Sequence, residues 1–250
     1  MISNLLKGKT AIITGCNRGI GKSILENFAK AGANCVACVR KETDEFKNFC
    51  VEISKKNNIK IDVFSFDLSN ETDVLNGAKK IISKHKKIDV LVNNAGILFN
   101  SIFHMTSQKK LKEMFQINFF SQVVLTQQIS REMMKNKIGS IIFISSTSAK
   151  RNDIGRFAYS STKAAISSTT RVLAKELGPV NIRVNSICPG LTKTEMADQN
   201  TRKDFLDEEL KKISLNRIGK VHEIADVAIF LASELSTYVT GQNIIVDGGA

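Results

Sequence analysis

The sequence predicts an α/β fold in which a doubly wound parallel sheet of about seven strands lies between layers of helices on both faces. Short apolar runs alternate with longer segments of helical periodicity, as parallel sheets require. A glycine-rich turn, Gly15–Gly21, directly follows the first apolar run. Polar residues suited to chemistry come after later apolar runs, at the carboxyl ends of the expected strands, where such sheets bind ligands.

The elements follow one another without a break. The expected strands are 10–14, 34–39, 61–65, 88–92, 140–145, 181–187 and 243–246. Ile20, Ile24, Leu25 and Phe28 recur at helical spacing, which predicts a helix ending near Ala31 and Gly32. Long helices are expected around 106–137 and 159–177. No linker, repeat or low-complexity tract interrupts this order, so residues 1–250 are expected to form one domain.

The glycine turn predicts a phosphate site. It reads Gly15-Cys16-Asn17-Arg18-Gly19-Ile20-Gly21 and connects the first strand to the first helix. Glycines let the backbone approach a ligand closely, and a helix N-terminus favours negative charge. Strand, turn and helix together are therefore suited to the pyrophosphate of a dinucleotide.

A second pattern predicts proton transfer at a carbonyl oxygen. Tyr159 and Lys163 lie one helical turn apart, and Ser146 ends the apolar run IIFIS. A free phenol has a pKa of about 10, which a nearby cation lowers toward the range of a useful acid or base. The Ser146 hydroxyl would hold the substrate oxygen. The structural alternative is an amphipathic helix with a half-buried Tyr and a solvated Lys.

With these motifs the chain resembles the short-chain dehydrogenase/reductase family over essentially its whole length. Thr14–Gly21 matches the family's TGxxxGIG turn, Asn93–Gly96 matches NNAG, and Pro189-Gly190 is followed by Thr192. Asp67 follows the apolar run IDVFSF and matches the acidic residue that meets the adenine. The resemblance implies a Rossmann-type three-layer fold and a nicotinamide cofactor.

The resemblance also implies residue roles. Tyr159 would give a proton to the carbonyl oxygen, Lys163 would lower the pKa of Tyr159 and contact the nicotinamide ribose, and Ser146 would orient the carbonyl. Asn118 would hold a water that links Lys163 to solvent. The residues expected to bind the cofactor are Gly15, Asn17, Arg18, Gly19, Ile20, Gly21, Arg40, Asp67, Leu68, Asn94, Ala95, Gly96, Tyr159, Lys163, Pro189, Gly190 and Thr192.

Charge favours NADPH over NADH. NAD-specific members of the family usually carry an Asp at the end of the second strand, whereas this strand is followed by Arg40 and Lys41. A guanidinium can bind a 2′-phosphate through two hydrogen bonds, and a carboxylate would repel it. Arg18 is a second candidate for this contact. The alternative is that Arg40 is simply exposed.

The substrate is less sharply indicated. The segment that ends in VTGQNIIVDGG looks like the 3-oxoacyl-[acyl-carrier-protein] reductase branch, and Lys137 falls in a segment that docks the acidic carrier there. Two features depart from the branch: Gly178–Asn181 lacks the expected base, and Arg156-Phe157-Ala158 replaces Gln-Ala-Asn. Arg151, Arg156 and Lys193 are expected to border the substrate cleft.

Two other functions stay open. One is the same chemistry on another small carbonyl or secondary alcohol, such as a sugar or polyol. The other is a nucleotide-sensing protein without turnover, which the intact set Asn118, Ser146, Tyr159 and Lys163 argues against.

Composition narrows the remaining classes. No apolar run approaches the ~20 residues of a membrane span, and a cytoplasmic protein is expected. The net charge of +12 comes mainly from scattered lysines, which suits an acidic carrier better than nucleic acid. By resemblance the protein is expected to form a homotetramer or homodimer.

The five cysteines predict neither a disulfide framework nor a metal site. Cys35 and Cys38 fall in one strand three residues apart, so their side chains point to opposite faces. Cys16 lies near a helix N-terminus that could lower its pKa, although packing is the simpler explanation of this residue.

Overall fold

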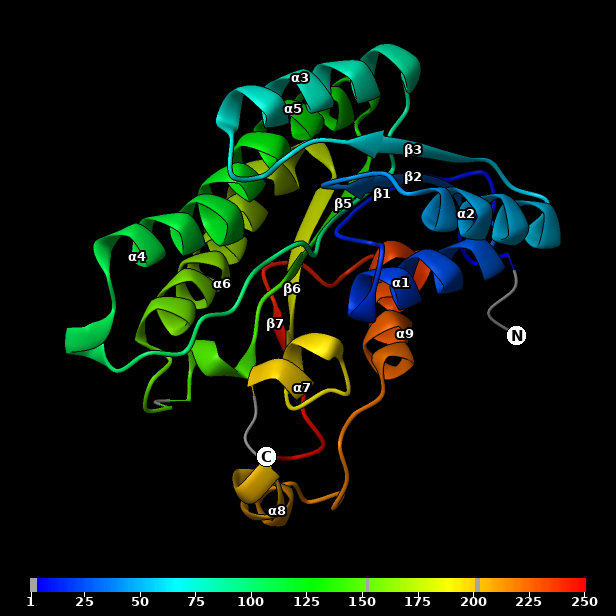
Figure 1. Ribbon diagram of the computed structural model, residues 1–250. Helices are drawn as coiled ribbons and strands as arrows, with labels where there is room; N and C mark the ends of the chain where they lie inside the picture. The colour runs from blue at the N-terminus through cyan, green and yellow to red at the C-terminus, as the bar shows by residue number, and fades with distance from the viewer. Residues whose placement is uncertain (1–3, 152, 201–202) are drawn as a thin grey trace.

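The computed structural model describes residues 4–151, 153–200 and 203–250 and has a seven-stranded parallel sheet at its centre (Figure 1). The strand order is β3-β2-β1-β4-β5-β6-β7. The strands are β1 (Thr10–Thr14), β2 (Asn34–Val39), β3 (Ile61–Ser65), β4 (Val90–Asn93), β5 (Gly139–Ile144), β6 (Ile182–Pro189) and β7 (Asn243–Val246). The predicted fold class is therefore confirmed, with strand ends that differ by at most a few residues.

Helices cover both faces of the sheet (Figure 1). One face carries α1 (Gly19–Lys30), α2 (Asp44–Asn57) and α9 (Val221–Ala232). The other carries α3 (Glu71–Lys84), α5 (Ser121–Asn136) and α6 (Phe157–Leu177), with α4 (Gln108–Phe115) packed beside α6. Two further helices, α7 (Glu195–Asn200) and α8 (Lys203–Lys212), follow β6.

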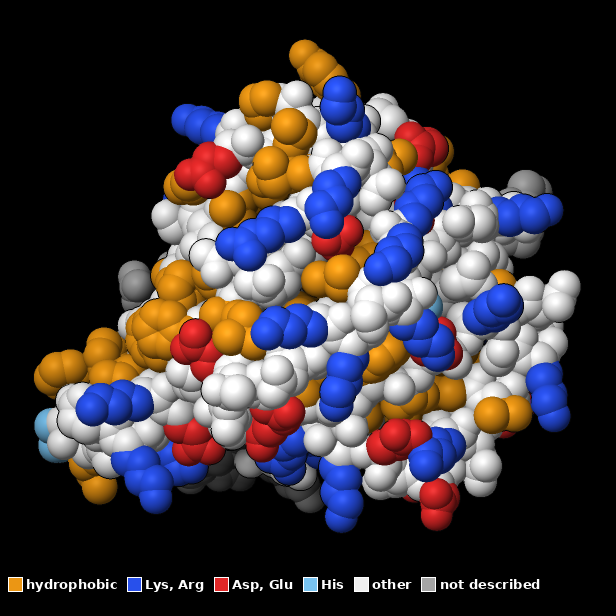
Figure 2. All heavy atoms as spheres, turned by 90° about the horizontal axis from the view of Figure 1, so that it is seen from above, with side chains coloured by type: hydrophobic (Ala, Val, Ile, Leu, Met, Phe, Trp, Pro, Cys, Tyr) orange, Lys and Arg blue, Asp and Glu red, His pale blue; other side chains and the backbone are white. Residues whose placement is uncertain are grey.

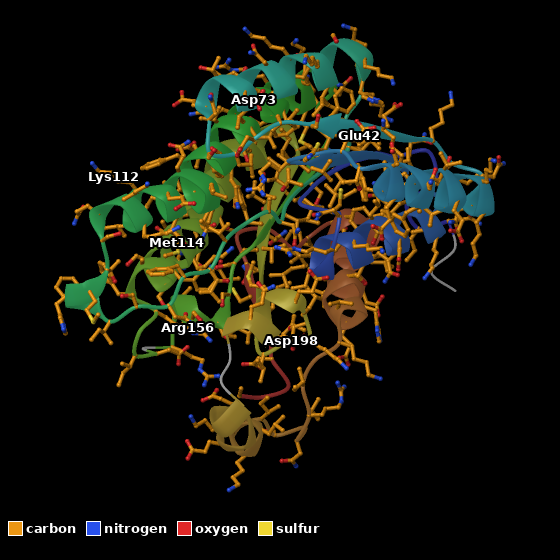
Figure 3. The ribbon with its side chains drawn as sticks, viewed as in Figure 1. Glu42, Asp73, Lys112, Met114, Arg156 and Asp198 are labelled. Atoms are coloured by element: carbon orange, nitrogen blue, oxygen red, sulfur yellow. The ribbon has the colours of Figure 1, made fainter. Side chains whose placement is uncertain are left out.

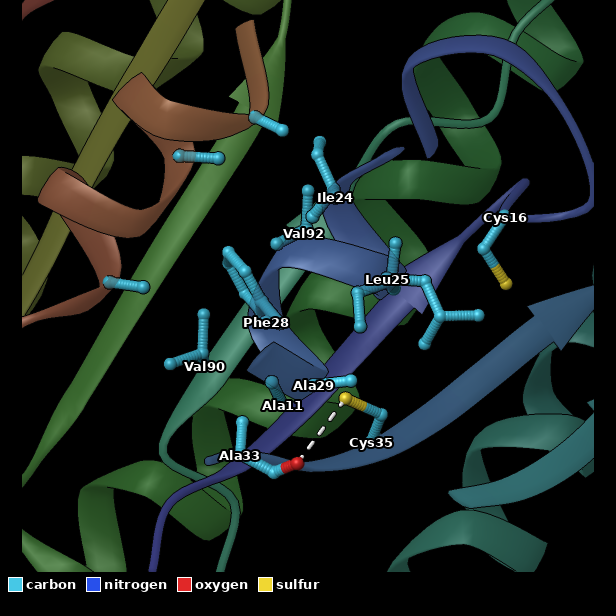
Figure 4. Packing of buried hydrophobic residues seen from close by; sticks show 14 of the residues in the cluster. Ala11, Cys16, Ile24, Leu25, Phe28, Ala29, Ala33, Cys35, Val90 and Val92 are labelled. Atoms are coloured by element: carbon cyan, nitrogen blue, oxygen red, sulfur yellow. Dashed lines mark hydrogen bonds between the residues drawn. The ribbon is translucent and has the colours of Figure 1, made fainter. Parts of the chain in front are cut away.

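Alternation along the strands separates two apolar cores. Ala11 and Ile13 of β1 face α1 and α9, whereas Ile12 faces the core beneath α3, α5 and α6. Figure 4 shows Ile24, Leu25 and Phe28 of α1 among side chains of β1 and β4.

The cysteines follow the same alternation. Cys35 lies in the core on the α1 face and Cys38 in the core on the α3 face, as predicted for a strand. All five cysteines are free and buried. Among the described residues no group of three or more His, Cys, Asp or Glu side chains could hold a metal ion. Burial raises the pKa of the Cys16 thiol well above its ordinary value, so the possible lowering by the helix N-terminus is not what the structure shows.

The long helix expected around 106–137 is interrupted. A π-helical segment, Gln116–Phe120, lies between α4 and α5. Such a segment contains an extra residue in the turn, which redirects its side chains and is common at functional sites. Asn118 lies within it and is fully buried.

The surface carries dispersed charge. On the face shown in Figure 2, Lys and Arg side chains lie apart from one another, and several adjoin acidic ones. Within the described ranges no helix is both long and apolar enough to cross a bilayer.

The contact between α3 and the end of β3 generates the first prediction. A Cβ on Gly77 would lie 2.5 Å from the ring of the buried Phe66, which directly precedes Asp67. Gly77→Ala is expected to lower the unfolding free energy by about 1–3 kcal/mol, because the packed ring has little room to move. Denaturant unfolding measures the change.

Gly178→Ala is the matched control for Gly77→Ala. Gly178 has helical backbone angles, and a Cβ on this residue would meet nothing within 4 Å apart from its chain neighbours. Because Pro179 follows and disfavours a side chain in this conformation, the substitution is expected to lower stability slightly, by less than Gly77→Ala. Equal stabilities of the two variants would contradict the proposed clash with Phe66.

Candidate active site

The glycine turn is fixed against the segment that follows β4. Gly15 has φ +65°, and a Cβ there would lie 2.8 Å from Cα of Ala95. The Thr14 hydroxyl oxygen accepts hydrogen bonds from the backbone N–H groups of Asn94 (3.0 Å) and Ala95 (3.1 Å). Asn94 Nδ2 donates to the carbonyls of Thr14 (2.9 Å) and Gly15 (3.1 Å). Two of the predicted cofactor segments are therefore joined.

The N-terminus of α1 is suited to an anion. Thr43, Asn70 and Ser107 cap α2, α3 and α4 with their side chains, whereas α1 has no side-chain cap and no acidic residue in its first turn. Its N–H groups and partial positive charge therefore fit the predicted pyrophosphate. A cavity of about 340 Å³ adjoins this end, lined by Gly19, Lys22, Ser23, Glu26, Lys193, Thr194, Glu195, Asp198 and Val221.

The predicted phosphate-binding residues are placed differently from one another. Arg40 is exposed directly after β2, and Asn17 is exposed in the turn. Arg18 forms an ion pair with Glu195 of α7, which lines the cavity; Nη1 of Arg18 lies 3.0 Å from Oε2 of Glu195. Arg40 is thus open to solvent, and Arg18 already has an acidic partner.

The remaining predicted cofactor residues lie at the ends of β3 and β6. Asp67 Oδ1 accepts from the Ser69 N–H (2.8 Å), so its carboxylate also stabilises the turn that contains Leu68. The Pro189 carbonyl accepts from the Thr147 hydroxyl (3.3 Å). Thr192 is buried, and its hydroxyl donates to the Gly190 carbonyl (3.1 Å).

The structure brings the predicted catalytic residues together. Ser146 follows β5 and lies near enough to Tyr159 for their side-chain interaction to lower the pKa of the phenol. Lys163 Nζ lies 5.6 Å from the centre of the Tyr159 ring and donates to the Ile144 carbonyl (2.7 Å).

Asn118 is tied to the chain after β4 by a reciprocal pair of bonds. Its Oδ1 accepts from the Ile97 N–H (2.8 Å), and its Nδ2 donates to the Ile97 carbonyl (2.9 Å). A Cβ on Gly96 would lie 3.1 Å from Asn118 Oδ1 and 3.7 Å from Lys163 Nζ. Asn118, Gly96 and Lys163 therefore converge on one point.

Burial sets the protonation of this group. It raises the pKa of Tyr159 above its ordinary value, while the hydrogen bond from Ser146 and the charge of Arg156 act in the opposite direction. Burial also lowers the pKa of Lys163 to about 8. The expected lowering of the Tyr159 pKa below its ordinary value is therefore wrong, because the desolvation of the phenolate outweighs the neighbouring charges.

Several residues with a part in this geometry were not predicted. Thr162 accepts from Asn118 Nδ2 (3.2 Å), and Gln122 Nε2 donates to the Ala95 carbonyl (2.7 Å). Both residues are buried polar side chains. Their only sequence signal is a polar residue at a helix position that should be apolar, which is too weak to interpret alone.

Comparison with known proteins identifies the class. A family model described as enoyl-(acyl carrier protein) reductase matches residues 15–250. The 3-oxoacyl-[acyl-carrier-protein] reductase of Aquifex aeolicus is 36% identical over 249 residues, which cover 98% of each chain.

Two solved structures extend the comparison. A 7α-hydroxysteroid dehydrogenase complexed with NADH and 7-oxo glycochenodeoxycholic acid is 34% identical with a TM-score of 0.91, and the match covers 99% of this chain and 96% of that one. The NADPH-dependent 3-quinuclidinone reductase of Rhodotorula rubra is 28% identical with a TM-score of 0.92, and the match covers 100% and 92%.

The chain belongs to the short-chain dehydrogenase/reductase family. It is a nicotinamide-nucleotide-dependent oxidoreductase of the carbonyl-reducing kind. The relatives act on acyl-carrier thioesters, steroids and a bicyclic ketone and use either nucleotide. Fold and class are thus shared across substrates that differ in size and charge.

The buried Lys163 predicts a pH dependence of stability. The unfolded chain keeps the lysine proton up to about pH 10.5, whereas the folded protein loses it near pH 8. Between these values the unfolded state binds more protons, so stability rises with pH in this window. The unfolding free energy of the wild type relative to Lys163→Met is expected to rise by about 1–3 kcal/mol across it.

Chemical denaturation of both proteins at several pH values measures this difference. The comparison removes the titration of the cysteines, which both proteins share. A difference that stays constant from neutral pH to pH 10.5 would contradict a Lys163 pKa of about 8.

Proposed function

We propose that this protein is an NADPH-dependent reductase of 3-oxoacyl thioesters carried on acyl carrier protein, as used in fatty acid synthesis. The convergence of Ser146, Tyr159 and Lys163 beside the glycine turn carries the proposal. The likeness to acyl-carrier-protein reductases along the whole chain supports it. In this proposal residues 1–250 act as one nucleotide-binding domain in the cytoplasm.

Tyr159 is the proposed proton donor. Because burial raises its pKa, the phenol is protonated at neutral pH and can give its proton to an oxygen that becomes an alkoxide. The Ser146 hydroxyl holds that oxygen next to the phenol. Bound NADPH supplies hydride to the carbonyl carbon.

Lys163 and Asn118 support the proton donor. With a pKa of about 8, Lys163 can both carry and release a proton near neutral pH. Asn118 fixes Gly96 and Ile97 beside the Lys163 ammonium. We assign to this point the water that would connect Lys163 to solvent.

The cofactor would lie across the strand ends. The glycine turn and the uncapped α1 would hold the pyrophosphate, Asp67 and Leu68 the adenine, and Pro189, Gly190 and Thr192 the nicotinamide end. Exposed Arg40 supports a preference for the 2′-phosphate. Glu42, the nearest acid after β2, lies 3.2 Å from the Lys47 ammonium and is thereby partly neutralised.

Surface features support the proposed partners. Exposed apolar side chains occur on and beside the helices through which the family forms tetramers or dimers, among them Phe120, Met134 and Val172. Lys137 is exposed at the end of α5, where it could meet an acidic carrier. The net charge of +12 favours the same kind of partner.

A second candidate is the reduction of another small carbonyl, including sugars and polyols. Two observations favour it: the solved relatives with a steroid and a bicyclic ketone as substrates, and Arg156 in place of the branch's Gln. A nucleotide sensor is less well supported, because all four predicted catalytic residues are present.

The first test of the proposal is NADPH oxidation with an acetoacetyl thioester. Turnover is expected in the wild type, and Tyr159→Phe is expected to lose about 10²–10⁴-fold in kcat because the proton donor is gone. NADPH binding, followed by its fluorescence, is expected to persist in the variant. Tyr238→Phe is the control, since Tyr238 is the chain's other tyrosine and is fully exposed.

Unchanged kcat in Tyr159→Phe would rule out the mechanism. If the wild type binds NADPH but does not reduce the thioester, another carbonyl substrate takes its place. A panel of steroid, sugar and cyclic ketones then separates the candidates.

Cofactor preference tests the role of Arg40. Arg40→Asp is expected to weaken NADPH binding about tenfold or more, since it replaces a charged hydrogen-bond donor with a group that repels phosphate. NADH binding is expected to change much less. Lys41→Asp makes the same change of charge one residue further on, and an equal effect there would show a general electrostatic influence rather than a contact from Arg40.

A further inference from the structure

Arg156 is a charged residue near Tyr159 to which the proposed mechanism gives no role. It directly precedes α6, three residues before Tyr159, and Figure 3 labels it at the start of this helix. Its guanidinium Nη1 donates to the Ser148 hydroxyl (3.3 Å). Its backbone is held as well, because the Arg156 N–H donates to the Asp153 carbonyl (3.3 Å).

A short chain of hydrogen bonds leads from Arg156 to the candidate active site. The Ser148 N–H donates to the Ser146 hydroxyl oxygen (3.1 Å), and the interaction of Ser146 with the Tyr159 side chain lowers the pKa of the phenol. Ser148 is buried, so water does not compete freely for these bonds. The Arg156 guanidinium therefore contacts the side chain of the residue whose backbone N–H holds the Ser146 hydroxyl.

The Arg156 guanidinium differs from that of nearby Arg151 in the kind of group that it contacts. Arg151 is paired with Glu209 of α8 (2.8 Å) and lies 3.5 Å from Asp153, and Glu209 also meets Lys212 (2.6 Å). The Arg156 guanidinium contacts a neutral hydroxyl, which itself donates to Asp153 (3.5 Å).

Arg156 and Lys163 both carry a positive charge near the phenol, and they differ in how easily they lose it. Burial lowers the pKa of Lys163 to about 8, whereas a guanidinium is not deprotonated in proteins. At alkaline pH the fixed charge near Tyr159 is therefore that of Arg156. Its effect on the Tyr159 pKa is a lowering, opposed to that of burial.

We propose that Arg156 is a positioning residue of this site, which holds Ser146 through Ser148 and supplies the fixed positive charge that stabilises the Tyr159 phenolate. The proposal rests on the proposed function only for its kinetic consequence. The electrostatic effect on Tyr159 exists whatever the substrate.

The chain allows Tyr159 to be titrated directly. It contains two tyrosines and no tryptophan, so in a Tyr238→Phe background the ultraviolet absorbance of tyrosinate reports Tyr159 alone. Arg156→Gln, Arg156→Lys and Lys150→Gln are compared in this background, over the pH range in which the circular dichroism is constant. Lys150 is an exposed cation on the same loop and serves as the matched control.

Arg156→Gln is expected to move the titration of Tyr159 upward by about half a pH unit or more, the size of one charge acting through a partly solvated path. Arg156→Lys is expected to restore most of the shift, and Lys150→Gln to coincide with the reference. Coincident curves for Arg156→Gln and the reference overturn the proposal. An equal shift in Lys150→Gln overturns it too.

Ser148→Ala provides a second test should Arg156→Gln fail to fold. It removes the hydroxyl contact but retains the charge, so a smaller upward shift is expected, and an unmoved curve overturns the linkage through Ser148. In the active enzyme kcat/KM for reduction is expected to fall in Arg156→Gln and to be largely restored in Arg156→Lys. An unchanged kcat/KM in Arg156→Gln while the titration moves overturns the positioning role, whereas absence of reductase activity in the wild type refutes the proposed function alone.

Discussion

The buried ammonium of Lys163 is the constraint on which the candidate site depends. A buried ammonium has little contact with water and needs hydrogen-bond acceptors from the protein. Its burial is costly unless these acceptors are fixed in place. Here the Ile144 carbonyl at the end of β5 accepts its hydrogen bond. Ile144, the last residue of β5, therefore accepts the hydrogen bond of the Lys163 ammonium. The chain that follows it places Ser146 next to Tyr159.

The π-helical segment also contributes to the surroundings of the Lys163 ammonium. An unbroken α-helix would point the Asn118 side chain in a different direction. The extra residue of the π-helical segment lets the Asn118 amide pair with both backbone groups of Ile97. That pairing holds Gly96 so close that a Cβ would crowd Asn118 Oδ1 at 3.1 Å and would touch Lys163 Nζ at 3.7 Å. The π-helical segment, Gly96 and Lys163 are therefore packed against one another.

Sequence patterns predicted the fold and the grouping of site residues but not the protonation of the site. The strands were found because apolar runs are long and their alternation is fixed by the sheet, and Cys35 and Cys38 fell on opposite faces for the same reason. Ser146, Tyr159 and Lys163 were found because each follows a recognisable strand or helix signal. Desolvation of Tyr159 depends on neighbours distant in the chain, so no local pattern predicted that burial would outweigh the nearby charges. The π segment was missed because its neighbours have ordinary helical periodicity.

The segment that follows β6 is held firmly where it leaves the strand and weakly at α7. At its root Thr192 forms a backbone bridge with Gly219, and the Lys193 N–H donates to the Gly219 carbonyl (2.9 Å). Further along, α7 meets the glycine turn through the Arg18–Glu195 pair, whose side chains are 56% and 58% exposed. An ion pair so exposed contributes about 0–1 kcal/mol. The root therefore fixes the course of this segment, and exchange of Glu195 for another anion at Arg18 would cost the fold little.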